Sequence, residues 1–304
     1  MKESILPHIL KTGLALDPAK TAIYYYDEIH SYETVNALVG KLAQGFIEKL
    51  KLKKGDVVAI QSSNSVEFAL TLLACLRTGI SLTPLNPALK TDEIRYQLEN
   101  SDAKCFLYEG YVAEKAREAA GKGKVQQVIF NGEKVEGELG FEEVYADTEY
   151  EPLPLAPDTI ALIIYTSGTT GKPKGVLLSH SNISEMLDMI IESLQLTDKD
   201  RSLLILPLFH VNAIHFKLLA VLLQGGSVVI RKRFVLGEFL PAVERYKPTF
   251  TSGVPTVYAM LANLPKGTEH QYDLSSMRFG ICGADRMSTR LNSSHLGISY
   301  AAFC

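Results

Sequence analysis

The stretch Tyr165-Thr-Ser-Gly-Thr-Thr-Gly-Lys-Pro-Lys-Gly-Val176 follows the apolar run 160–164 and decides how the rest of the chain is interpreted. Glycine has no Cβ, so a loop of this composition can wrap its backbone N–H groups around phosphate oxygens. Lys174 adds positive charge, and residues 176–180 have the pattern of a second strand. Further donors are the hydroxyl groups of Thr166, Ser167, Thr169 and Thr170. The sequence therefore predicts a strand, a phosphate-binding loop and another strand.

The loop differs from the Walker A element, whose G-x-x-x-x-G-K-[ST] pattern opens a helix. Thr166 stands where the first glycine of that pattern would be, and Lys172 is followed by Pro173, which has no N–H to donate. A flexible surface hairpin of Gly and Thr is the alternative interpretation. The twelve positions together favour phosphate binding, because they resemble the signature loop of adenylate-forming enzymes. That superfamily includes acyl-CoA synthetases, the adenylation domains of peptide synthetases, and luciferases.

Composition and charge narrow the class of protein. The 304 residues are 46% hydrophobic and 21% charged, with a formal net charge of −3, which gives no electrostatic argument for nucleic acid or an anionic membrane as partner. No apolar run reaches the roughly eighteen residues that span a bilayer, and the N-terminus lacks the pattern of a signal peptide. Four scattered cysteines form no C-x-x-C pair, so the expected location is cytoplasmic. The sequence defines no oligomeric state.

Helix and strand patterns alternate along the chain, which predicts parallel strands joined by right-handed crossovers. The acidic, proline-containing stretch 131–158 has linker composition. The expected fold is α/β, with two packed, doubly wound subdomains at 1–130 and 159–285. Its expected elements include a helix to 194 capped at Asn182, and helices over 214–224 and 236–246.

A second motif is Leu206-Pro-Leu-Phe-His210-Val-Asn-Ala213, which follows a predicted strand at the end where open α/β sheets place ligands. A lone histidine there is more often structural than catalytic. The segment resembles the Pro-x-Phe-His segment of the adenylate-forming family. This resemblance implies that His210 orients the substrate carboxylate or the adenylate, beside an acyl pocket that includes Val211 and Ile214. Ile214 stands where some long-chain members carry a gating tryptophan.

The third motif, Gly280-Ile-Cys-Gly-Ala284, resembles the turn that receives adenine in the same family. Gly283 and Ala284 have no bulk, so a purine can lie flat against the backbone. A Gly-Ala pair after a strand is common by itself. The resemblance is more specific here because neighbouring segments also resemble the family. The resemblance also implies that Thr166 contacts Mg²⁺ and that Lys174 and His210 are catalytic. It assigns the phosphates of ATP to Thr166, Ser167, Gly168, Thr169, Thr170, Gly171 and Lys174.

The activity that this resemblance implies is ATP-dependent activation of a carboxylic acid, with a fatty acid favoured. An acyl-adenylate would form first and be converted to a coenzyme A thioester, so the implied ligands are ATP, Mg²⁺, coenzyme A and the acid. The segment 209–213 is closer to acyl-CoA synthetases than to amino-acid adenylation domains. The alternatives are an amino-acid or aryl-acid adenylation domain, and a nucleotide-binding fragment without turnover.

The resemblance covers residues from about 20 to 285 and then stops. The family continues with an aromatic-Gly-x-Thr-Glu segment and a C-terminal domain that supplies a lysine, and neither pattern occurs in these 304 residues. Residues 286–304 show no helix or strand period and look like translated adapter sequence, with a divergent natural C-terminus as the alternative. The expectation is an incomplete N-terminal part of a ligase, inactive by itself, that carries a non-native tail.

Overall fold

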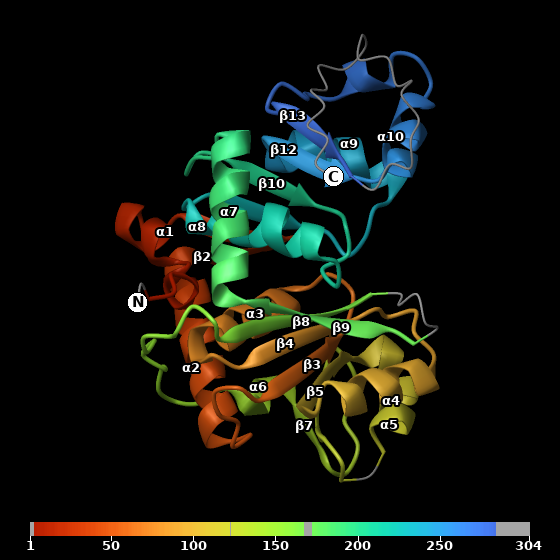
Figure 1. Cartoon of the computed structure of the whole chain (residues 1–304). Coiled ribbons are helices and arrows are strands. Elements are labelled where there is room, and N and C mark those ends of the chain that lie inside the picture. Colours follow the sequence, from red (N-terminus) through yellow and green to blue (C-terminus); the bar gives the residue numbers. More distant parts are fainter. Residues whose placement is uncertain (1–2, 122, 167–171, 284–304) are drawn as a thin grey trace.

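The structure is a computed structural model that describes residues 3–121, 123–166 and 172–283. Within these ranges the strands form two sheets, one stacked above the other, with helices between them and on their outer sides (Figure 1). Most neighbouring strands are parallel and are joined by helices. The arrangement confirms the expected α/β fold with two packed, doubly wound sheets.

The first sheet has seven strands in the order β7-β6-β5-β3-β4-β8-β9. All neighbours from β7 to β8 are parallel, and β9 pairs antiparallel with β8 at one edge. The central strand β3 is buried throughout, as expected for a parallel strand covered on both faces. The strands are β3 (Val57–Gln61), β4 (Ser81–Leu85), β5 (Ala103–Glu109), β6 (Gln126–Phe130), β7 (Glu138–Gly140), β8 (Ile160–Thr166) and β9 (Lys174–Ser179).

The second sheet has six strands in the order β13-β12-β10-β11-β1-β2. It repeats the plan of the first, because a parallel series ends in one antiparallel edge strand, here β2. The strands are β1 (Thr21–Tyr25), β2 (Glu28–Ser31), β10 (Arg201–Leu204), β11 (Ser227–Ile230), β12 (Phe250–Gly253) and β13 (Phe279–Cys282).

The helices fill the spaces beside the sheets. The α-helices are α1 (Lys11–Leu16), α2 (Tyr32–Glu48), α3 (Val66–Thr78), α4 (Thr91–Asn100), α5 (Ala113–Ala120), α6 (Phe141–Val144), α7 (His180–Leu194), α8 (Ala220–Leu223), α9 (Leu236–Tyr246) and α10 (Pro255–Ala262). Short 3₁₀ helices are η1 (Leu6–His8), η2 (Gly110–Val112) and η4 (Thr268–Gln271), and η3 (Ala213–Leu219) is a π-helix.

The apolar core is divided into three clusters by the two sheets. The largest lies between the sheets, where α2, α3, α7 and η3 pack against the inner faces of both. A second cluster lies under α4 and α5 on the outer face of the seven-stranded sheet. The third lies under α9 and α10 on the outer face of the six-stranded sheet. The layers therefore run helix, sheet, helix, sheet, helix, and the central helices serve both sheets.

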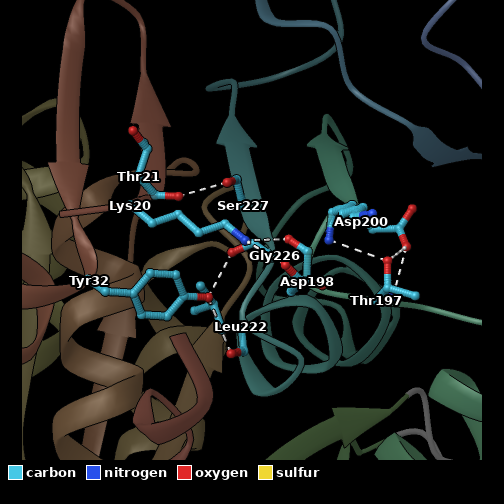
Figure 2. A network of polar contacts seen from close by, with 10 residues as sticks. Lys20, Thr21, Tyr32, Thr197, Asp198, Asp200, Leu222, Gly226 and Ser227 are labelled. Atoms are coloured by element: carbon cyan, nitrogen blue, oxygen red, sulfur yellow. Dashed lines mark hydrogen bonds and ion pairs between the residues drawn. The ribbon is translucent and has the colours of Figure 1, made fainter. Parts of the chain in front are cut away.

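Polar contacts fix the N-terminal strand β1 to elements from much later in the chain (Figure 2). The hydroxyl of Tyr32, fully buried at the start of α2, donates a hydrogen bond of 2.7 Å to the carbonyl of Gly226. The hydroxyl of Ser227 donates to the carbonyl of Thr21, also at 2.7 Å. Residues 21–31 thus belong to the sheet that the second half of the chain builds.

The predicted division of the chain at 131–158 does not follow the sheets. β1 and β2 lie in the predicted first subdomain, but they pair in the six-stranded sheet. β8 and β9 lie in the predicted second subdomain, but they complete the seven-stranded sheet. Local periodicity does not encode long-range pairing, which explains the error. The stretch expected to be a linker also contains β7 and α6. Its Glu138 is buried and pairs with Arg117 at 2.6 Å.

The predicted positions of single helices agree with the structure more closely than the predicted subdomains do. Helix α9 has the bounds that the sequence predicts. Helix α7 begins three residues earlier than predicted, because Ser179 and not Asn182 is the N-cap: its hydroxyl accepts from the Asn182 N–H, and the Asn182 side chain accepts from the Ser179 N–H. The predicted helix over 214–224 is π-helical at first, as η3, and α-helical only in α8.

Candidate functional site

The β8–β9 hairpin holds the two ends of the predicted phosphate loop next to each other. Thr166 ends β8, Lys174 begins β9, and the two residues lie opposite each other in the antiparallel register. Both are exposed, so a hydroxyl and an ammonium group are open to a phosphate. The other predicted phosphate contacts lie outside the described residues: Ser167, Gly168, Thr169, Thr170 and Gly171.

Two tyrosines fix this hairpin to α4. The hydroxyl of Tyr96 donates to the carbonyl of Pro173 at 3.0 Å, and that of Tyr165 donates to the side chain of Asn100 at 2.7 Å. The two rings meet edge to face at 6.5 Å, and the exposed Lys172 lies 5.8 Å from the centroid of the Tyr96 ring. These tyrosine contacts are not predictable from the sequence, because tyrosines on separate elements form no local pattern.

His210 lies in the loop that follows β10 in the six-stranded sheet. Its N–H donates to the carbonyl of Pro207 at 3.0 Å, and its own carbonyl accepts from the N–H groups of Ala213 and Ile214, which begin η3. The ring is exposed on one side and contacts Phe209, with 4.3 Å between ring centroids. Partial burial lowers the pKa of His210 below its usual value, which favours the neutral imidazole.

Two other predicted substrate contacts follow His210. Val211 is partly buried, and Ile214 is fully buried in the core between the sheets. An acid could touch Ile214 only by entering this core.

The predicted adenine turn meets the His210 segment through Asn212. The N–H of Gly283, which directly follows β13, donates to the carbonyl of Gly253 at 3.1 Å. Among the described residues, a Cβ added to Gly283 would meet the side-chain nitrogen of Asn212 at 3.7 Å and no other atom within 4 Å. The other side-chain atom of Asn212 accepts from the hydroxyl of Ser252 at 3.0 Å. Asn212 therefore joins the carboxyl ends of β10, β12 and β13. Ala284 lies outside the described residues.

A buried asparagine from the seven-stranded sheet positions the His210 loop. Asn64, between β3 and α3, donates to the carbonyls of Leu206 and Arg231 at 3.0 and 2.9 Å. Its side-chain oxygen accepts from the N–H of Leu208 at 2.7 Å. The roles of Asn64 and Asn212 are not predictable from the sequence, since a single asparagine forms no spacing pattern.

A second link between the sheets is ionic. Glu109 ends β5 and is buried, and it accepts from the N–H and the hydroxyl of Ser63 at 3.0 and 2.6 Å. Its other oxygen lies 3.8 Å from the ammonium of Lys232, which follows β11. The carboxyl ends of both sheets therefore face a common region, with Thr166 and Lys174 on one sheet and His210 and Gly283 on the other.

The described ranges hold no group of three or more His, Cys, Asp or Glu side chains arranged to bind a metal ion. In the same ranges, no helix combines the length and apolarity required to cross a bilayer.

Comparisons with known proteins agree with this geometry. The chain is 32% identical over 281 residues to a feruloyl-CoA synthase from Amycolatopsis sp., which covers 92% of this chain and 54% of the relative. It is 32% identical over 274 residues to 4-coumarate–CoA ligase 3 from Oryza sativa subsp. japonica, with 88% and 49% covered. The chain thus spans about half the length of these curated relatives.

A solved long-chain-fatty-acid–CoA ligase from Archaeoglobus fulgidus has a TM-score of 0.84 and 25% identity, over 95% of this chain and 59% of that one. An anthranilate CoA ligase in complex with anthranoyl-AMP has a TM-score of 0.85 over 94% of this chain and 56% of that one; at 23% identity it shows the fold alone. The family model described as AMP-binding enzyme matches residues 11–296. The chain therefore belongs to the AMP-binding enzyme family.

Proposed function

We propose that this chain forms the acid-binding and nucleotide-binding part of an ATP-dependent carboxylic acid–CoA ligase. The observation that carries the proposal is that the His210 loop and the Gly283 turn meet at Asn212, at the carboxyl ends of parallel strands. Open α/β sheets bind ligands at such ends. The relatives that are named as CoA ligases support the same activity.

ATP fits the residues that the structure describes. Gly283 has no side chain, and among the described residues only Asn212 comes within 4 Å of a Cβ built on it, which would let a flat adenine approach the backbone. The exposed Thr166 hydroxyl and Lys174 ammonium would contact the phosphates. Mg²⁺, held by Thr166 and phosphate oxygens, would neutralise charge on the departing pyrophosphate.

The chemistry has two steps in this proposal. A carboxylate oxygen attacks the α-phosphorus of ATP and pyrophosphate leaves; the sulfur of coenzyme A then attacks the acyl carbon and AMP leaves. His210 would orient the carboxylate by donating a hydrogen bond from a neutral ring. Lys174 would stabilise the negative charge that develops on the phosphates. Both residues act by positioning and electrostatics, which suits a reaction between two anions.

The acid is a finer part of the proposal. A fatty acyl chain is supported by the apolar residues in the segment that follows His210, which include Ile214 and Phe216. An aromatic acid is the second candidate, since feruloyl-CoA synthase and 4-coumarate–CoA ligase are named for such acids. We also propose a cytoplasmic location, because the cysteines show no disulfide pattern.

The test begins with genomic DNA, which gives the coding sequence beyond Asp285. The encoded protein is then assayed with ATP, Mg²⁺, coenzyme A and a panel of fatty, aromatic and amino acids. We expect acid-dependent release of pyrophosphate, followed by a coenzyme A thioester. Activation without transfer to coenzyme A would favour an adenylation domain, and ATP binding without any pyrophosphate release would overturn the proposal. The 304-residue chain is assayed alongside, which tests the prediction that it is inactive alone.

A further inference from the structure

The π-helix η3, which begins just after His210, carries a lysine with no polar partner. Lys217 has no exposed surface, and its ammonium nitrogen has no hydrogen-bond partner among the described residues. The nitrogen lies 3.9 Å from the centroid of the Phe250 ring on β12. A buried ammonium without a hydrogen bond or a counter-charge is costly, and a cation–π contact replaces only a small part of its hydration.

Lys217 lies between η3 and β12, as Asn212 does, but farther from the Gly283 turn. Asn212 and Lys217 are five residues apart, and the i→i+5 bonding of a π-helix places such residues about one turn from each other. Asn212 contacts Ser252 and Lys217 contacts Phe250, and residues 250 and 252 lie on one face of β12. Two residues advance a strand by roughly 6.6 Å. The seam between η3 and β12 therefore leads from the Gly283 turn to the Lys217 ammonium.

The backbone of η3 is fixed at this depth. The carbonyl of Lys217 accepts a hydrogen bond of 2.6 Å from the hydroxyl of Ser202 on β10. His215 is also buried on η3, and its Nε2 atom has no partner among the described residues. It is two residues from Lys217, about half a turn away, so it lies on a different side of the helix.

We propose that Lys217 binds a second anionic group at the distal end of the acid substrate, and that the substrate is a short α,ω-dicarboxylic acid. One carboxylate would react beside His210 and Asn212, and the other would reach along the seam to Lys217. The inference rests on the proposed function and names its substrate class.

The chemistry favours an anion over a neutral distal group. A carboxylate supplies both the hydrogen-bond acceptors and the opposite charge that Lys217 lacks. An alkyl chain end would leave the ammonium as it is, without a partner. Discrimination by a buried polar group is correspondingly strong, because the wrong substrate leaves that group unpaired.

The test compares glutarate and adipate with pentanoate and hexanoate, which lack the distal carboxylate. Their affinities for the 304-residue chain are measured by calorimetric titration with and without ATP, and pyrophosphate release is measured on the complete gene product. We expect the dicarboxylates to bind about tenfold more tightly or better, as for one charge-assisted contact. Lys217→Met should abolish this preference and leave monocarboxylate binding within about twofold. Lys199→Met, a change at an exposed lysine, should keep the preference.

Equal affinity of the wild-type protein for both classes would overturn the inference, whether or not the variant folds. A preference that survives in Lys217→Met would also overturn it. Its failure is distinguishable from that of the proposed function. An enzyme that activates monocarboxylates as readily as dicarboxylates keeps the proposed function and refutes the role of Lys217. Dicarboxylate binding that depends on Lys217, without pyrophosphate release from any acid, supports the inference and refutes the proposed function.

Discussion

The side chain of Asn64 accepts a hydrogen bond of 2.7 Å from the backbone N–H of Leu208, two residues before His210. Asn64 follows a strand of the seven-stranded sheet, and Leu208 follows a strand of the other. The loop that carries the candidate catalytic histidine is thus held in place from the opposite sheet.

Replacing Asn64 by alanine should destabilise the protein. Its amide also donates to the carbonyls of Leu206 and Arg231, so three backbone groups would lose a partner at a buried position. We expect the free energy of unfolding to fall by about 2–4 kcal/mol. Urea denaturation measures it, with the exposed Asn263→Ala as control, expected to stay within about 0.5 kcal/mol. Equal effects of the two changes would contradict this account of Asn64.

Gly283→Val should block nucleotide binding without unfolding the protein. The added side chain would occupy the space beside Asn212, where the purine is proposed to lie. Affinity for a fluorescent ATP analogue should fall about tenfold or more, a loss of roughly 1.4 kcal/mol. Gly237→Val in α9 is the matched control, because a Cβ there meets no atom of the described residues within 4 Å. Unchanged affinity in Gly283→Val would show that adenine does not bind at this turn.

Lys174→Met should weaken ATP binding more than Lys172→Met does. Lys174 is exposed and begins β9 opposite Thr166, whereas Lys172 lies over the Tyr96 ring. Loss of a charge-assisted contact costs about 1.5–3 kcal/mol, a factor of roughly ten to a hundred. Titrations at one fixed ionic strength measure the two affinities. A larger loss for Lys172→Met would reverse the assignment of the phosphate contact.

Stability should decrease in mild acid because of buried histidines. Burial lowers the pKa of His180 and of His215 to about 4, from about 6.5 in an unfolded chain. Between these values the unfolded chain binds protons that the folded protein does not. The free energy of unfolding therefore falls as the pH falls from about 6.5 to about 4. His180→Gln should reduce this slope, measured by urea denaturation at several pH values, whereas the exposed His8→Gln should not.

Lys217→Met should stabilise the ligand-free protein at pH 7. Burial lowers the pKa of the Lys217 ammonium well below its usual value, so at neutral pH the unfolded chain binds this proton more readily than the folded one. We expect a gain of about 1–3 kcal/mol, and the gain should shrink as the pH approaches about 10.4. Thermal unfolding of both proteins at pH 7 and pH 10 measures the difference. A gain that is independent of pH would point to packing instead of charge.

The sequence predicted what depends on neighbours along the chain. Helix α9 has its expected bounds, and β8 and β9 lie within two residues of the expected strands 160–164 and 176–180, since apolar spacing alone defines them. The sequence did not predict which strands belong to which sheet, because the pairing of β1 with β11 joins residues far apart in the chain. The short strands β2 and β7 were missed, as strands of three or four residues are too short to show a period.

The candidate site was predictable to a similar extent. The motifs predict roles for Thr166, Lys174, His210 and Gly283, and these roles stay predictions. In the structure Thr166 ends β8, Lys174 begins β9, Gly283 follows β13 and His210 lies in the loop after β10. Asn64, Asn212 and Lys217 act through contacts between elements, which no local pattern reveals. The π-helical turn around Lys217 was also unforeseeable, because apolar spacing there fits an ordinary α-helix.

The exchange of strands between the two halves of the chain has a consequence for biosynthesis. Ile23 leaves the ribosome early, but its partner in the parallel register is Val228. At roughly 5–20 residues per second, β1 and the apolar face of α2 remain without their final neighbours for about 10–40 s. During that time the nascent chain exposes an unpaired strand edge, a target for chaperones and a hazard for self-association.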